Sequence, residues 1–186
     1  WDSAQRAITR LQVGARALES RALNSFALSS IARVQGKLAM ADQATRDFIT
    51  ASEQRGLPGS ALWGEAQTAL QQVWFTGDTS RALATLEEAL ARRPLAGIPP
   101  AERPYSMLAS AYALAGQPAR ARQLLREYES AVPEGVRRSD YLWYAARGYT
   151  SMAEGNYQEA IASFQAFYDE SGCSNCAMYE IRRAYE

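Results

Sequence analysis

The sequence has 186 residues, of which 47% are apolar, and 20 lysines and arginines balance 20 aspartates and glutamates. This composition is typical of an ordinary globular chain, and a net charge of zero gives no indication of a nucleic-acid partner. The chain contains no histidine, which excludes Ser-His-Asp and Cys-His nucleophile systems and the HExxH zinc motif.

Residues 1–21 have helical periodicity, with Ile8 and Leu11 on one face and Gly14 interrupting the pattern. We interpret them as a helix of a preceding unit. The chain starts at Trp1 with no basic or apolar leader, and no run approaches the ~18 consecutive apolar residues of a membrane-spanning helix. We therefore expect a segment of a longer or processed protein, without a membrane span of its own.

Four glycines recur at a nearly constant spacing along the rest of the chain. Gly36, Gly77, Gly116 and Gly155 are 41, 39 and 39 residues apart, and each lies between two stretches of helical periodicity. Glycine adopts the positive φ at which many helices end, so each position predicts the turn of an antiparallel helical pair. No segment alternates like a strand, and the predicted class is all-α. The predicted units are residues 22–58, 60–95, 101–135 and 140–172, with a partial unit at 175–186.

A small residue follows each of these glycines near the start of the second helix. These residues are Ala41, Ala82, Ala121 and Ala160. A small side chain at a helix crossing lets the two backbones approach each other, so we predict that all four are buried. The stretches 95–104 and 133–140 are lengthened connections, and they account for the long period.

The positions around Gly116 resemble the tetratricopeptide repeat (TPR). The matching residues are Tyr105, Leu108, Ala109, Tyr112, Gly116, Ala121, Leu125, Tyr128 and Pro133. The resemblance implies tandem helix-turn-helix units that form a right-handed α-solenoid and bind proteins or peptides.

Residues 60–186 also resemble the TPR region that follows the kinase domain in bacterial transmembrane serine/threonine kinases and related regulators. The resemblance lies in Trp74-Phe75-x-Gly77-Asp78, Ile98-Pro-Pro-Ala101, Arg103-Pro104-Tyr105 and Cys173-x2-Cys176. It implies a non-catalytic scaffold or sensor, slightly favoured to lie on the extracytoplasmic side. The Gly-rich loop, HRD and DFG motifs of the kinase itself are absent.

Cys173 and Cys176 form the one constellation that suggests chemistry. Structural zinc would need two further ligands, which only carboxylates could supply in a chain without histidine. A thioredoxin-like redox role would require a βαβ setting. The favoured interpretation is a local disulfide or a pair of partly buried thiols that shapes the turn, and a disulfide would favour an extracytoplasmic location.

The TPR resemblance places the partner site on first-helix residues that do not carry the packing signature. In this register they are Phe26, Ser30, Gln67, Gln71, Trp74, Phe75, Ser106, Ser110, Leu114, Tyr149 and Met152. The set lacks the Lys, Arg and Asn residues of the family's carboxylate clamp. We therefore expect a hydrophobic or amide-rich contact with a helix or extended segment and little salt dependence. Trp74 has an alternative role, which is to close the core between adjacent units.

The sequence favours a protein-interaction module without enzymatic activity, cofactor or metal. One version is the sensor region of a kinase-type receptor. A second version is an accessory subunit that braces a larger, membrane-associated complex. The alternative from another class is a thiol-redox protein that uses Cys173 and Cys176.

Overall fold

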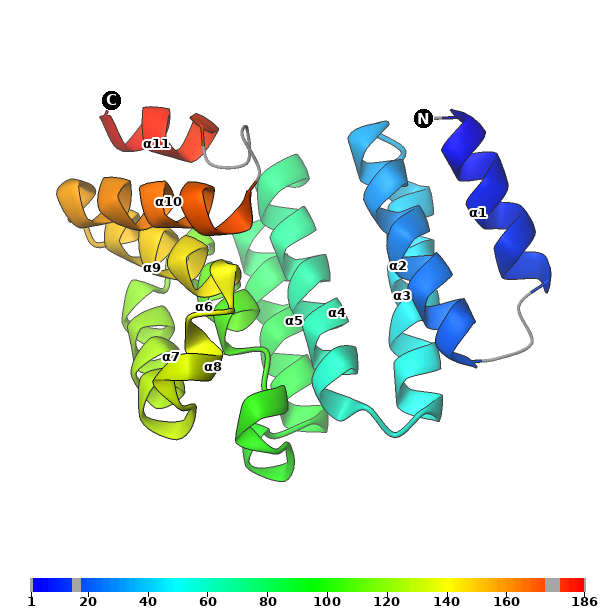
Figure 1. The fold of residues 1–186 in the computed structure, drawn as a ribbon, viewed down its shortest axis with the longest axis horizontal. Coiled ribbons are helices and arrows are strands. Elements are labelled where there is room, and N and C mark those ends of the chain that lie inside the picture. The colour runs from blue at the N-terminus through cyan, green and yellow to red at the C-terminus, as the bar shows by residue number, and fades with distance from the viewer. Residues whose placement is uncertain (1, 15–17, 173–177, 186) are drawn as a thin grey trace.

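The computed structural model describes residues 2–14, 18–172 and 178–185, and this described part contains helices and no strand, so its predicted all-α class is confirmed. In chain order the elements are α1 (Asp2–Gly14), α2 (Leu18–Val34), α3 (Leu38–Gln54), α4 (Pro58–Gln71), the π-helical turn η1 (Gln72–Thr76), α5 (Thr79–Arg92), the 3-10 turns η2 (Leu95–Gly97) and η3 (Pro100–Glu102), α6 (Tyr105–Leu114), α7 (Pro118–Ala131), α8 (Glu134–Arg137), α9 (Tyr141–Ala153), α10 (Tyr157–Ser171) and α11 (Met178–Tyr185). Helices α2 to α5 pack in sequence, whereas α9, α10 and α11 lie across them, so the molecule bends along its length (Figure 1).

The chain reverses at each of the four predicted glycines. Gly36, Gly77, Gly116 and Gly155 have φ angles of 70°, 66°, 81° and 78°, in the left-handed region that side chains disfavour. They separate α2 from α3, η1 from α5, α6 from α7 and α9 from α10, and the two helices of each pair pack together. Gly56, with a φ of 68°, makes a further turn between α3 and α4 that the sequence analysis did not identify.

Small residues lie at the helix crossings, as the sequence predicts. Ala41, Ala82, Ala121 and Ala160 all have an exposed fraction of 0%. Gly148 in α9 shows how close the approach is, because a Cβ added there would lie 2.5 Å from Cε1 of Phe164 in α10. The helical pairs therefore depend on side chains no larger than alanine at these positions.

Two segments differ in detail from the sequence analysis. Helix α2 begins at Leu18, so residues 18–21 belong to the first helical pair and not to the preceding helix. The lengthened connections contain short helices, with η2 and η3 inside residues 95–104 and α8 inside residues 133–140. The period is long because these turns add residues between helical pairs without lengthening the main helices.

Candidate partner-binding hollow

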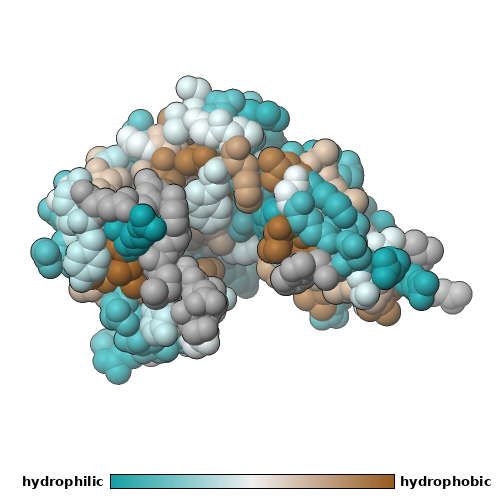
Figure 2. All heavy atoms as spheres, turned by 90° about the horizontal axis from the view of Figure 1, so that it is seen from above, coloured by the Kyte–Doolittle hydropathy of each residue, from teal (hydrophilic) through white to brown (hydrophobic). Residues whose placement is uncertain are grey.

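A hollow of about 350 Å³ is lined by α2, α4 and η1 from the N-terminal part of the chain and by α6, α9 and α10 from the C-terminal part. In the ribbon, α2 lies in one arm of the bent molecule and α9 and α10 lie in the other (Figure 1). The first helix of every pair contributes to the hollow. Its lining residues are Phe26, Arg33, Trp63, Gln67, Leu70, Trp74, Ser106, Met107, Ser110, Tyr141, Leu142, Ala145, Tyr149 and Phe167. Most of these side chains are apolar or aromatic, and apolar surface gathers around the hollow in Figure 2.

Aromatic rings build the wall formed by the N-terminal helices. Phe26 of α2, Phe48 of α3 and Trp63 of α4 have ring centroids 5.3 to 6.1 Å apart, in tilted or edge-to-face arrangements. Such geometries are the ones that aromatic pairs prefer. Phe26 remains 39% exposed, so this wall offers an aromatic surface that the chain itself leaves partly uncovered.

A second aromatic pair forms the opposite wall. Tyr141 of α9 stacks on Phe167 of α10, with centroids 5.9 Å apart and ring planes 28° apart. Tyr141 is also exposed, and Leu142 and Ala145 continue the wall along α9. The two walls therefore present aromatic rings to the same space.

The floor of the hollow is formed by α6, and its hydroxyl groups are already engaged. Ser106 Oγ donates to Asp140 Oδ2 at 2.6 Å, and Ser110 Oγ donates to the carbonyl of Ser106 at 2.9 Å. Asp140 also accepts from Tyr128 Oη at 3.0 Å. Burial, and after it the charge of Asp140, raises the pKa of Tyr128. The hydroxyl groups of these serines therefore bond within the chain, where Asp140 links α6 to α7 and α9. The apolar part of the floor is Met107.

A π-helical turn at the end of α4 sets the position of Trp74. The turn η1 is a rare feature that is frequent at functional sites. Trp74 is 47% exposed, and its ring lies 6.5 Å from the ring of Tyr149, which packs edge-to-face on Phe164 at 5.1 Å. Trp74 thus joins the second helical pair to the fourth at the edge of the hollow.

Arg33 is a charged residue of the hollow that the sequence analysis missed. Its Nη2 donates to Ser30 Oγ at 3.2 Å. With the Gln71 amide in the orientation that satisfies its neighbours, Gln71 accepts from Arg33 Nη1 at 2.8 Å and donates to Asp42 Oδ1 at 2.8 Å. Burial lowers the pKa of Arg33. Gln71 therefore positions Arg33 through this hydrogen bond, and Gln71 itself does not line the hollow.

The structure brings together only part of the predicted partner site. The predicted residues that line the hollow are Phe26, Gln67, Trp74, Ser106, Ser110 and Tyr149. Among the others, Gln71 is buried, and Leu114 and Met152 pack against the core. Ser30 bonds to Arg33 outside the lining, and Phe75 is exposed away from the hollow.

Several lining residues escaped the sequence analysis because the transferred register did not include them. They are Arg33, Trp63, Leu70, Met107, Tyr141, Leu142, Ala145 and Phe167. Trp74 lines the hollow whereas its neighbour Phe75, in the same π-helical turn, does not. The aromatic residues Trp63 and Tyr141 on first helices were a signal that could have been used.

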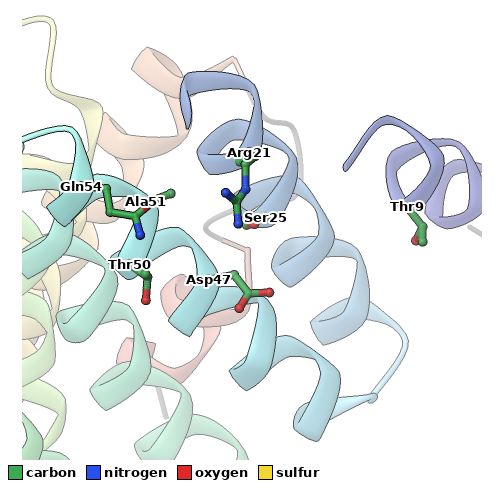
Figure 3. Close-up of a pocket in the computed structure, with 7 residues that line it drawn as sticks. All are labelled: Thr9, Arg21, Ser25, Asp47, Thr50, Ala51 and Gln54. Carbon is green, nitrogen blue, oxygen red and sulfur yellow. The ribbon is translucent and has the colours of Figure 1, made fainter. Parts of the chain in front are cut away.

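A second hollow, of about 310 Å³, lies between α1, α2 and α3 (Figure 3). Its lining residues are Thr9, Arg21, Ser25, Asp47, Thr50, Ala51 and Gln54. Arg21 and Asp47 reach into it from α2 and α3. This lining contains no aromatic residue and so lacks the side chains that anchor most protein interfaces.

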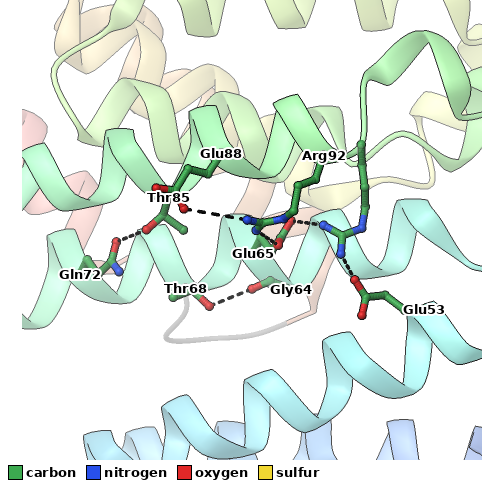
Figure 4. A network of polar contacts seen from close by, with 9 residues as sticks. Glu53, Gly64, Glu65, Thr68, Gln72, Thr85, Glu88 and Arg92 are labelled. Atoms are coloured by element: carbon green, nitrogen blue, oxygen red, sulfur yellow. Dashed lines mark hydrogen bonds and ion pairs between the residues drawn. The ribbon is translucent and has the colours of Figure 1, made fainter.

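An ion-pair cluster around the buried side chain of Glu65 joins α3, α4 and the end of α5 (Figure 4). Glu65 of α4 accepts from Arg92 Nη2 at 2.5 Å and from Arg93 Nη1 at 2.7 Å, and Arg93 also pairs with Glu53 of α3. Burial raises the pKa of Glu65, and the hydrogen bond from Arg92 opposes that effect. Every charged member contacts another member, so the cluster connects the first two helical pairs.

The described residues contain no other constellation that suggests chemistry. Within them, no group of three acidic, cysteine or histidine residues is placed to hold a metal ion. The same part of the chain contains no helix that is long and apolar enough to cross a membrane. Cys173 and Cys176, the predicted disulfide or redox pair, lie outside the described residues.

Comparisons of the chain with protein-family models, curated proteins and solved structures found no match. The TPR resemblance therefore rests on the sequence positions given above.

Proposed function

We propose that this chain is a non-catalytic protein-interaction module whose TPR-like helical pairs form a right-handed α-solenoid. Its hollow binds an apolar helix or extended segment of a partner protein. The observation that carries the proposal is the set of partly exposed aromatic rings around one hollow, Phe26, Trp74 and Tyr141. Aromatic side chains dominate the affinity of many protein interfaces, and an exposed apolar patch of this kind commonly marks a binding surface.

The arrangement of the walls favours a protein segment as the ligand. Phe26 on α2 and Tyr141 on α9 come from opposite arms, and the hollow between them is open in Figure 2. A helix laid in such a groove can place apolar side chains on both walls at once, at the i, i+3, i+4 and i+7 positions of one face. The serines of the floor, already hydrogen-bonded, require no partner from the ligand.

The proposal has two versions, which differ in stoichiometry. In the sensor version the ligand is a segment that binds reversibly, as expected for a receptor region. In the bracing version the ligand belongs to a larger assembly that purifies with this chain in a fixed ratio. The measured stoichiometry of the isolated complex distinguishes the two.

Site-specific photocrosslinking tests the proposal. A photoreactive phenylalanine analogue replaces Trp74 in one variant and Tyr157 in the other, an exposed aromatic of α10 that does not line the hollow. In native extract we expect the position-74 variant to crosslink one partner protein reproducibly and the position-157 variant to leave that partner unlabelled. Equal labelling from both positions, or no partner at position 74, would contradict a binding role for the hollow.

A further inference from the structure

Arg33 and Gln67 are polar residues of a hollow that is otherwise mainly apolar. Both line the hollow, and both also line a small void of about 10 Å³ that adjoins Phe26, Phe48 and Trp63. The side chains of Arg33 and Gln67 therefore border the same space. Within the described residues, no carboxylate lies within 4.0 Å of Arg33, and the Gln67 side chain has no hydrogen-bond partner.

The chain holds Arg33 in place but does not neutralise it. Its two bonds within the described residues go to neutral acceptors, Ser30 and Gln71, whereas a guanidinium has five N–H donors. Asp42 is the nearby acid, and the Gln71 amide stands between it and Arg33. A partly buried charge without a counterion costs free energy, and a ligand carboxylate would remove that cost.

We propose that Arg33 and Gln67 select a partner segment that carries an Asp or Glu side chain among apolar residues. The inference rests on the proposed function of the hollow and names the chemistry of its ligand. The carboxylate accepts from the remaining N–H groups of Arg33 and from the Gln67 amide, and the apolar residues beside it contact the aromatic walls. This arrangement gives charge complementarity at one point of an apolar interface.

The position of Arg33 indicates a side-chain carboxylate and not the end of a chain. Phe26 precedes Arg33 along α2, and its ring packs against Trp63 near the start of α4. Gln71 contacts Arg33 farther along α4, and Trp74 lies beyond it. Apolar lining thus extends on both sides of Arg33, so a bound segment continues past it in both directions.

A peptide selection tests this inference. The probe is a library of peptides about twelve residues long, roughly the length of three helical turns, with both ends blocked so that no terminal carboxylate is present. Each position is drawn from Leu, Phe, Ala, Ser, Gln and Glu. Selection on the intact protein should enrich Glu over Gln at one position flanked by Leu or Phe, and a selected peptide should bind roughly tenfold or more weakly after Glu→Gln replacement.

Three protein variants test whether Arg33 is the residue that binds the peptide carboxylate. Arg33→Gln should remove the preference for Glu over Gln, and Arg33→Lys should retain the preference with weaker binding because lysine lacks the planar fork of donors. Arg46→Gln removes an equal charge from an exposed site of α3 that does not line the hollow and should leave the preference intact. Equal selection of Glu and Gln by the parent, or the same Glu preference in Arg33→Gln, would overturn the inference. Failure of the parent to enrich any apolar peptide would instead contradict the proposed function itself, and the inference with it.

Discussion

The ring of Trp74 lies 6.5 Å from the ring of Tyr149, and this contact joins the second helical pair to the fourth. The two residues have different surroundings. Tyr149 is only 9% exposed and packs on Phe164, whereas Trp74 is 47% exposed. Tyr149 is therefore mainly a packing residue beneath the Trp74 ring, and Trp74 presents its ring to the hollow. Because Trp74 buries less surface within the chain, its effects on binding and on stability can be separated.

The alanines at the helix crossings should tolerate no larger side chain. We expect Ala121→Leu and Ala160→Leu to lower the free energy of unfolding by about 1–3 kcal/mol, because the added methyl groups have no space at a residue with 0% exposure. Arg126→Leu, at an exposed position of α7, should change it by less than about 0.5 kcal/mol. Urea unfolding measures all three, and equal losses would show that the assigned crossing is wrong.

The contact between Gly148 and Phe164 can be tested with a double-mutant cycle. Gly148→Ala should cost about 1–3 kcal/mol, because its Cβ would lie 2.5 Å from the Phe164 ring. The same change in a Phe164→Leu background should cost less, since the clashing ring is gone. Gly135→Ala, where nothing lies within 4 Å, is the control. Additive effects of the two substitutions would exclude the close contact.

The ion pair between Arg122 and Glu154 should make stability depend on pH. Arg122 Nη2 lies 2.5 Å from Glu154 Oε2, and its hydrogen bond lowers the pKa of Glu154. A lowered pKa in the folded protein means a stabilisation that is present above the ordinary value of 4.5 and is lost as the pH falls through the folded pKa. Glu154→Gln should therefore cost about 1 kcal/mol near neutral pH and almost nothing in strong acid.

The matched control for Glu154 is Glu134→Gln, which removes a carboxylate from the exposed pair with Arg138. An exposed pair contributes little, so this variant should differ from the parent by a few tenths of a kcal/mol at most. The measurement is urea unfolding of the three proteins over a series of pH values. A cost of Glu154→Gln that grows as the pH falls would contradict the direction of the pKa shift.

The sequence predicted the helical pairs because their determinants are local. A glycine with positive φ and an alanine a few residues later are sufficient to mark a turn and a close crossing, and all four instances are present. The all-α class follows from the same periodicity. The way the pairs are placed relative to one another depends on the angles between units, which no single local pattern determines.

The lining of the hollow was harder to predict, because it depends on how far each helix is rotated. The π-helical turn η1 changes the direction in which the side chains near Trp74 point. The residue types of this turn give no signal that predicts a π-helix. In the sequence, Arg33 looks like an ordinary solvent-exposed arginine at the end of a helix. Its position in the hollow is set by a contact with Gln71 of another helical pair, which only the folded chain reveals.

The binding role of the hollow is tested most directly by two neighbouring aromatic residues. Trp74 and Phe75 are both 47% exposed, but only Trp74 lines the hollow. With the partner identified by crosslinking, titration calorimetry should show that Trp74→Ala weakens binding by about 2 kcal/mol, roughly thirtyfold, while Phe75→Ala stays within about 0.5 kcal/mol of the parent. Unchanged binding by Trp74→Ala, or an equal loss from Phe75→Ala, would contradict the account.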